Sequence, residues 1–345
     1  MKILITNIVF NINVLYNIIY YSILGGVMNK DGIFSSNSIT VQNLTEIADK
    51  QTVMEERRMC EISELASEAV DYAVYMLKDG YGIYEILSMI SEGLSNVDAI
   101  PHTHSLSENR NQLISYLNFC NAYDKVIFVQ LFFKMICKEG INVSEAAFLD
   151  THLGNEIFTY VKNSLADEAY DVFSQNFQNP RVKYSDSLYS AARLVTSGDA
   201  EYALLPLEEH GGARLSTVAE ILFKEDLKIN SVTPVFGFEG IADMKYALVS
   251  KHFTIPELEA DDDRYLEIRL RADTSISLSE LFAAAEMFGC TLYRVNTISF
   301  ETEDGSIQYY SVVFRDEGKD FSTLLIYLTL FSGAYTPIGI YKNLE

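Results

Sequence analysis

The stretch Ala203-Leu-Leu-Pro-Leu-Glu-Glu-His-Gly-Gly212 indicates most clearly how this chain folds. Its apolar first half is bounded by Pro and Gly, which is typical of an interior strand of an α/β sheet. Ligands of such sheets lie beyond the carboxyl ends of the strands. The segment from Glu208 to Gly212 therefore stands where a binding site is expected.

The residues around this stretch alternate between strand and helix patterns. Strands are predicted at 157–161, 182–184, 202–207, 227–236 and 245–249, with helices at 166–177, 187–196 and 216–224. This alternation predicts a parallel sheet with right-handed crossovers. Residues 155–252 are thus expected to form a single α/β lobe of the βαβ type.

A second pattern follows an acidic linker at 257–264. Strands are predicted at 265–271, 291–300, 308–314 and 337–341, and helices at 278–288 and 321–331. The order strand, helix, strand, strand, helix, strand is the split βαβ arrangement. Residues 264–345 are therefore expected to form a C-terminal, ferredoxin-like βαββαβ domain.

The N-terminal part of the chain is predicted to be helical. Residues 55–150 show apolar side chains at helical spacing and are expected to form an all-helical unit. Residues 1–54 are expected to be an apolar N-terminal segment and a flexible lead-in. Residues 1–27 have two explanations: a membrane anchor, or a stretch that precedes a true start at Met28. The second is favoured because polar Asn side chains interrupt the apolar run.

Composition excludes several classes of function. The chain has 48 acidic and 26 basic residues, a net charge of −22, which repels phosphate backbones and anionic lipids. Neither nucleic acid nor a membrane is an expected partner. The cysteines lack CxxC spacing, so we expect reduced, mostly buried thiols of a cytoplasmic protein rather than a zinc site or disulfides: Cys60, Cys120, Cys137 and Cys290.

No pattern in the sequence predicts a metal or a cofactor. His102 and His104 are half of a metal site or part of a solvated loop. The loop is favoured because no acid or cysteine stands nearby at ligand spacing.

Three segments, in chain order, resemble successive motifs of the prephenate dehydratases. They are Tyr160-Val-Lys-Asn-Ser-Leu-Ala-Asp-Glu-Ala169, the stretch 197–212, and Met244-Lys-Tyr-Ala-Leu-Val249. The C-terminal unit, which ends Ala334-Tyr-Thr-Pro-Ile-Gly-Ile-Tyr341, resembles the regulatory ACT domain of that family. The resemblance covers about residues 155–345.

The resemblance implies periplasmic-binding-protein-like lobes that hold prephenate while it loses carbon dioxide and water to give phenylpyruvate. It implies no cofactor. It also implies a homodimer that pairs one face of the ACT-like sheet, with the contact expected from four apolar residues: Val312, Phe314, Ile338 and Ile340.

The sequence departs from the family pattern at the site. The family inserts a second lobe where this chain has only the link 237–243. The family's Pro-Ile-Glu-Asn-Ser is here Pro206-Leu-Glu-Glu-His210, which keeps Glu208 but adds a carboxylate that would repel a dicarboxylate substrate. Met244 replaces a catalytic Thr and cannot donate a hydrogen bond. The phenylalanine motif Glu-Ser-Arg-Pro aligns with Asn296-Thr-Ile-Ser299.

The sequence therefore predicts a prephenate-dehydratase-like protein that has lost catalysis and binds a small aromatic or carboxylate ligand, or a partner, in phenylalanine metabolism. Candidate ligand-binding residues are Ser164, Glu208, Glu209, Gly211 and Gly212. A solvated strand end without a ligand is a further interpretation. The alternative is an active prephenate dehydratase with Glu208 and His210 as catalytic candidates, for which residues 55–150 would fold over the lobe as its second wall.

Overall fold

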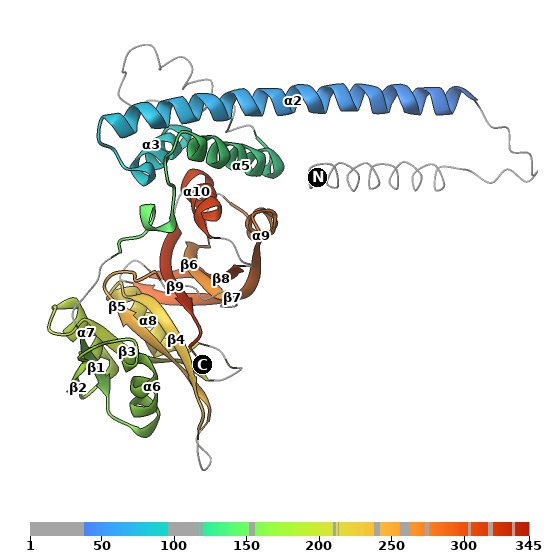
Figure 1. The fold of residues 1–345 in the computed structure, drawn as a ribbon. Helices are drawn as coiled ribbons and strands as arrows, with labels where there is room; N and C mark the ends of the chain where they lie inside the picture. Colours follow the sequence, from blue (N-terminus) through green and yellow to red (C-terminus); the bar gives the residue numbers. More distant parts are fainter. Residues whose placement is uncertain are drawn as a thin grey trace, which may run out of the picture. The chain divides into compact units, whose positions relative to one another are not determined.

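The computed structural model describes these parts of the chain: residues 38–95, 117, 120–151, 156–209, 212, 214–237, 242–255, 263–272, 276–302, 305–316, 320–332 and 335–344. It separates into two units, Met1–Arg57 and Arg58–Glu345, and the second contains the sheet (Figure 1). Several predictions lie outside the described residues, namely those on the segment 1–27, His102, His104, His210 and Gly211.

The described part of the second unit contains a mixed, 9-stranded sheet in the order β2-β1-β3-β5-β4-β9-β6-β8-β7. Its first half consists of β1 (Ile157–Val161), β2 (Arg181–Ser185), β3 (Tyr202–Glu209), β4 (Lys228–Val235) and β5 (Met244–Ser250). Its second half consists of β6 (Arg264–Arg271), β7 (Cys290–Thr302), β8 (Gly305–Asp316) and β9 (Tyr335–Lys342). Each strand that the sequence predicted is present.

The expected parallel sheet is only partly correct. Strand β1 pairs in parallel with β2 and β3, as predicted. Strand β5, in contrast, runs antiparallel to both β3 and β4. The chain between β4 and β5 is too short for a crossover, which takes a dozen or more residues, so the two strands meet as antiparallel neighbours.

The second half of the sheet has the order β9-β6-β8-β7, and its three pairings are antiparallel. It joins the first half where Ile229 of β4 pairs with Gly339 of β9. A Cβ atom at Gly339 would lie 2.9 Å from the Cβ of Ile229 and from a ring carbon of Tyr341. This close approach explains why a glycine stands at the joint.

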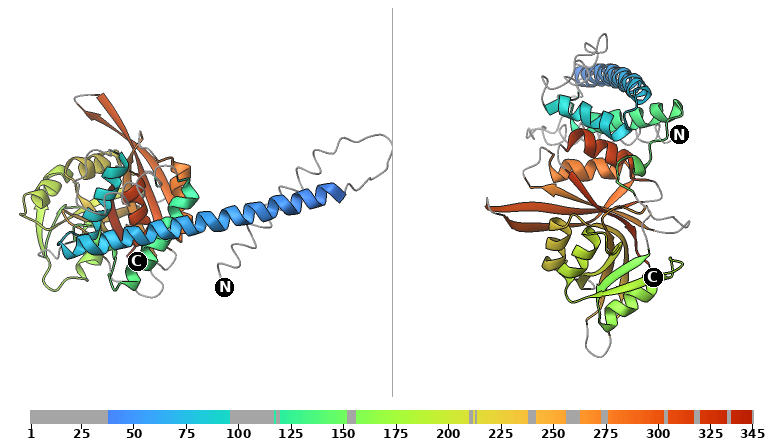
Figure 2. Two further views of the ribbon diagram at one scale, coloured as in Figure 1. Left: turned by 90° about the horizontal axis from the view of Figure 1, so that it is seen from above. Right: turned by 90° about the vertical axis from the view of Figure 1, so that its left-hand side faces the viewer.

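The helices of the first half lie on both faces of the sheet. Helices α7 (Leu188–Thr196) and α8 (Ser216–Lys224) share one apolar core with β3, β4 and β5. Helix α6 (Ser164–Ser174) packs with β1 and the opposite side of β3 and β5. The first half therefore is an α/β lobe with helices on two sides (Figure 2).

The helices α9 (Leu278–Met287) and α10 (Ser322–Phe331) cover one face of the second half of the sheet. The N-terminal helices α3 (Ile83–Ser95) and α5 (Ala122–Lys138), followed by a short 3-10 helix, η1 (Glu145–Ala147), join the same core. The core also includes residues 62–73 of α2 (Ser38–Lys78). Figure 1 shows α3 and α5 stacked on α10.

This packing contradicts the expectation, tied to an active dehydratase, that residues 55–150 fold over the lobe as its second wall. The helices bury their apolar side chains against α9 and α10 instead. Polar contacts hold them there: Lys125 lies 3.2 Å from Glu280, and Glu145 accepts hydrogen bonds from Arg264 and from the backbone N–H of Phe321. The helical unit therefore extends the C-terminal half of the molecule, not the lobe.

Two smaller expectations on the N-terminal part were wrong. Helix α2 begins at Ser38, so residues 38–54 are helical and not a flexible lead-in. This segment has no Gly or Pro, and Lys50 pairs with Glu46 one turn away at 2.8 Å. Cys60 and Cys137 are exposed, and of the four free thiols only Cys290 is buried. No helix in the described ranges is both long and apolar enough to cross a membrane.

The residues named for a dimer contact are buried within the chain. Val312, Phe314 and Ile340 belong to the core beneath α9 and α10, and Ile338 belongs to the core shared with α8. The expected contact through these four side chains is therefore wrong, because the helices cover three of them and the lobe covers Ile338. Homodimerisation itself stays a prediction.

Candidate functional site

The candidate site lies at the end of β3, where the lobe meets the second half of the sheet. The pairing of β3 with β5 shifts register between Pro206 and Glu208, which leaves Leu207 as an extra residue. Such a bulge re-aims the side chains that follow it. Leu204 and Pro206 line a cavity beside α6, whereas Leu207 and Glu208 line a pocket against the C-terminal strands. The bulge thus turns Glu208 away from the α6 side of the lobe.

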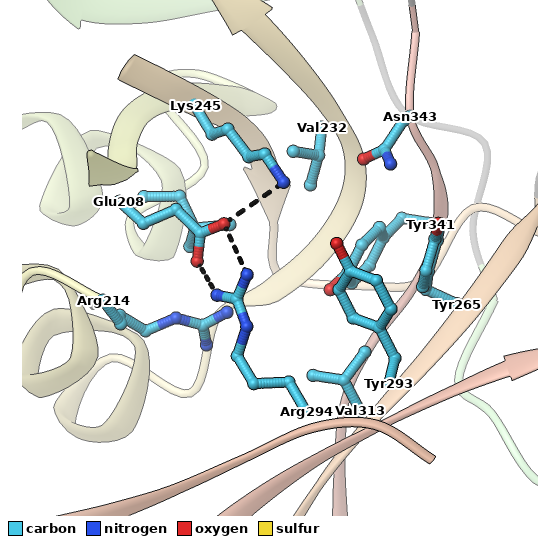
Figure 3. Close-up of a pocket in the computed structure, with 11 residues that line it drawn as sticks. Glu208, Arg214, Val232, Lys245, Tyr265, Tyr293, Arg294, Val313, Tyr341 and Asn343 are labelled. Carbon is cyan, nitrogen blue, oxygen red and sulfur yellow. Dashed lines mark hydrogen bonds and ion pairs between the residues drawn. The ribbon is translucent and has the colours of Figure 1, made fainter. Parts of the chain in front are cut away.

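Glu208 is buried, with 3% of its surface exposed, and is held by two cations. Arg294 of β7 donates from both terminal nitrogens to its two oxygens, and Lys245, directly opposite on β5, lies 3.3 Å from Oε1 (Figure 3). Burial lowers the pKa of Arg294, but the hydrogen bond and charge of Glu208 outweigh this effect, so the pKa of the guanidinium is raised. The guanidinium of Arg294 is therefore stabilised in its charged form.

A second bulge brings Arg294 to this place. The pairing of β7 with β8 shifts register between Leu292 and Arg294, so Tyr293 is the extra residue. Tyr293 and Arg294 both line the pocket, and the guanidinium lies 5.6 Å from the centre of the Tyr293 ring. Irregularities in two separate strands thus place the acid and the base opposite each other.

A second buried ion pair lies next to the first. Arg214 donates to both oxygens of Glu267, which is fully buried on β6. Glu267 also accepts hydrogen bonds from Ser311 at 2.7 Å and Tyr341 at 3.4 Å. Burial tends to lower the pKa of Arg214, but the charge of Glu267 raises it overall. Burial and the charge of Glu267 raise the pKa of Tyr341 well above its ordinary value.

The pocket at this junction has little free volume. Its free volume is about 20 Å³, close to the space that one water molecule requires. Figure 3 shows Lys245, Glu208 and Arg294 grouped on one side, with Tyr265, Tyr293 and Tyr341 on the other. The arrangement joins the two halves of the sheet through paired charges and leaves no room for a substrate.

The structure does not bring together all the residues that the sequence analysis proposed as ligands. Glu208 and Glu209 end β3, but Glu209 is exposed. The backbone N–H of Gly212 donates to the carbonyl of Glu209 at 2.8 Å. Ser164 is exposed at the start of α6 and does not line the pocket of Glu208. The interpretation of Glu208 as a solvated strand end is wrong, because it is buried and paired.

A different cavity lies at the crevice of the lobe, where α/β sheets bind ligands. Its volume is about 200 Å³, and its lining includes Asn163, Ser187, Pro206 and Tyr246. Asn163 and Ser187 cap the first turns of α6 and α7 through bonds to the backbone N–H groups of Ala166 and Ser190. The crevice therefore keeps free volume, whereas the junction does not.

The sequence analysis missed the residues that surround Glu208. Arg214, Glu267 and Arg294 were not among its candidates, and Lys245 was noted only within a motif. The sequence offered no local signal for them: in the alternating strand 265–271, Glu267 shares its face with the polar Arg269. Such a face usually contacts solvent, so the pattern did not indicate that Glu267 is buried. No described group of three His, Cys, Asp or Glu residues has the geometry to hold a metal ion.

Comparisons with known proteins give distant structural similarity only. No family model matches the chain, and a search of curated proteins found no match. The chain is similar to the prephenate dehydratase of Streptococcus mutans, with 15% identity, a TM-score of 0.46, and coverage of 55% of this chain and 100% of that chain. It is also similar to GqqA, described as a novel type of quorum quenching acylases (17% identity, TM-score 0.41, coverage 55% and 96%).

A further similar structure is the prephenate dehydratase of Arthrobacter aurescens in complex with L-Phe. Its identity is 12%, its TM-score 0.40, and the coverage is 54% of this chain and 89% of that chain. Similarity at this level says nothing about chemistry. The function must therefore be derived from the site itself.

Proposed function

We propose that this chain is a prephenate-dehydratase-like protein without catalytic activity, which acts as a ligand-binding or partner-binding regulatory protein linked to phenylalanine metabolism. The observation that carries the proposal is the environment of Glu208. This carboxylate, which survives from the resembled motif, is paired with Arg294 and Lys245 in a pocket of about 20 Å³.

Catalysis at Glu208 would require the group to contact a substrate. A general acid or base acts within hydrogen-bond distance of the proton that it transfers. Both carboxylate oxygens of Glu208 already accept bonds from Arg294, and only 3% of the residue is exposed. Prephenate has no path to this carboxylate unless the two halves of the sheet separate.

The surrounding residues support the same conclusion. Met244, at the position of the catalytic Thr in the resembled motif, begins β5 opposite Glu209. Its thioether cannot donate a proton to a departing hydroxyl. The exposed Glu209 adds negative charge at the end of β3 and would repel a dicarboxylate.

The crevice of the lobe supports the ligand-binding part of the proposal. Its cavity of about 200 Å³ lies at the ends of β1 and β3, beside the first turns of α6 and α7. It is smaller than most sites for small molecules, which measure about 300–1,000 Å³. A fragment-sized ligand is therefore the occupant that this crevice suits.

The test is to incubate the purified full chain with prephenate and to follow phenylpyruvate by its absorbance in alkali. We expect formation at the rate of the uncatalysed reaction, and the same rate with Glu208→Gln. Heat-treated protein is the control for the spontaneous reaction. A rate above this background that Glu208→Gln abolishes would show that the chain is an active dehydratase and that the proposal is wrong.

A further inference from the structure

The junction beside Glu208 contains more positive than negative side chains. Three cations line its pocket, namely Arg214, Lys245 and Arg294, whereas Glu208 is the one acid among the described lining residues. Glu267, which accepts from Arg214 on the neighbouring strand β6, is the second acid of the cluster. Three positive and two negative charges leave this group of side chains with a net charge of +1.

Lys245 is the surplus cation of this cluster. Each of the two guanidinium groups bonds to both oxygens of one carboxylate. Lys245 only shares Oε1 of Glu208 with Arg294, at 3.3 Å, although its side chain is 15% exposed. An ammonium has three N–H donors, so Lys245 keeps donors for a further acceptor. A positive charge with so little access to water is costly unless an anion balances it.

The pocket next to Lys245 suits a small ion. Its free volume is about 20 Å³, enough for a particle the size of one water molecule and too little for a carboxylic acid or a phosphate ester. Asn343 and Tyr293 also line it, and amide and phenol groups supply neutral donors. Figure 3 shows Lys245 and Asn343 on either side of the space that the tyrosines border. Asn343 and Tyr293 are exposed, so the pocket is open to ions from solvent.

We propose that this pocket binds one small monovalent anion, such as chloride, beside Lys245. The anion accepts from the ammonium of Lys245 and from the neutral donors of Asn343 and Tyr293, and it balances the surplus positive charge. Lys245 belongs to the lobe, on β5, whereas Tyr293 belongs to β7 and Asn343 follows β9. The anion therefore strengthens the contact between the two halves of the sheet. This inference does not depend on the loss of catalysis proposed for the chain.

The first test compares chloride with gluconate, an anion too large for the pocket. Urea unfolding of the full chain is measured at constant ionic strength while chloride replaces gluconate. An ion that binds only the folded chain stabilises it by mass action. Above the dissociation constant of the site, the unfolding equilibrium constant should fall about tenfold for each tenfold rise in chloride. An unfolding constant that is independent of chloride would overturn the proposal and indicate water as the occupant.

The variant Lys245→Met removes the surplus cation and leaves each carboxylate with one guanidinium. Its unfolding constant should no longer depend on chloride. Lys228→Met is the matched control, because Lys228 lies on the neighbouring strand β4, is 12% exposed and does not line the pocket. This control should keep the full dependence on chloride, and it shares any general effect of the salts. Equal dependence in the two variants would contradict a site at Lys245.

Bromide locates the ion without any substitution. Crystals of the unmodified chain grown with bromide in place of chloride are measured by anomalous diffraction, which distinguishes bromide from water. We expect an anomalous peak in the pocket, in contact with Nζ of Lys245. Peaks that lie only at other positions of the chain would overturn the proposal, even where chloride stabilises the fold.

Discussion

The two faces of β3 near its carboxyl end differ in what fills them. On one face, Leu204 and Pro206 border the crevice, which keeps a cavity of about 200 Å³. On the other, Leu207 and Glu208 meet Arg294 and Lys245 in a pocket of about 20 Å³. The bulge at Leu207 changes the face of β3 on which Glu208 lies. Because of this one extra residue, Glu208 points toward the second half of the sheet and not into the crevice.

The comparison shows how a carboxylate at the end of a strand can become part of an internal contact. A buried carboxylate is costly unless it is paired and hydrogen-bonded. At the junction both conditions are met by Arg294 and Lys245, and the neighbouring pair of Glu267 and Arg214 repeats the arrangement. The junction is therefore an interface within the chain, whereas the crevice keeps free volume.

The largest expected effect is that of Arg294→Met at the junction. The substitution leaves Glu208 buried with only Lys245 as a partner, and breaking a buried pair costs about 3–5 kcal/mol. Because 25% of the Arg294 side chain is exposed, we expect a loss at the lower end, about 3 kcal/mol, in the free energy of unfolding measured by urea.

A double substitution separates the charge from the packing. Arg294→Met combined with Glu208→Gln removes the unpaired buried charge and should recover about half of the loss. Glu209→Gln is the control at an exposed neighbour and should change stability by less than about 0.5 kcal/mol. If Arg294→Met behaves like Glu209→Gln, the pair does not hold the two halves of the sheet together.

The sequence was a good guide to the elements and a poor guide to the site, for a physical reason. Local periodicity indicates where helices and strands lie, and α8 was predicted with its observed bounds, Ser216–Lys224. The bulge at Leu207 has no such local signal, and strict alternation places Glu208 on the same face as Pro206. Arg294 is 86 residues away from Glu208 in the sequence, and no periodicity reports a contact over that distance.

An intermediate effect is expected at the crevice, from Asn163→Ala. The Asn163 side chain accepts from the backbone N–H of Ala166 at 2.9 Å and caps α6. Loss of such a cap costs about 1 kcal/mol. Thermal or urea unfolding measures it, with Ser164→Ala as the control, since Ser164 is exposed and follows the cap.

The result at Asn163 tests whether the crevice is the less constrained region. A loss as large as that of Arg294→Met would mean that the crevice is as tightly held as the junction. The proposed difference between the two faces of β3 would then disappear. A loss near 1 kcal/mol would match an ordinary helix cap.

The smallest effect is a pH dependence that Tyr341 contributes at the junction. Burial and the charge of Glu267 raise the pKa of Tyr341 well above its ordinary value near 10. The unfolded chain therefore releases this proton at lower pH than the folded chain does. The stability that Tyr341 contributes is complete below about pH 10 and is lost as the pH rises toward the pKa of the folded state.

The variant Tyr341→Phe removes this titration while it keeps the ring that packs against Tyr265. Between pH 8 and 10.5 the unmodified chain should lose about 0.8 kcal/mol more stability than the variant, as follows from one tyrosine that ionises only in the unfolded state. Urea unfolding at the two pH values measures the difference, and the other buried tyrosines cancel because both proteins contain them. An equal loss in the two proteins would mean that Tyr341 is accessible to solvent, and that the junction opens in the folded chain far more readily than its paired charges imply.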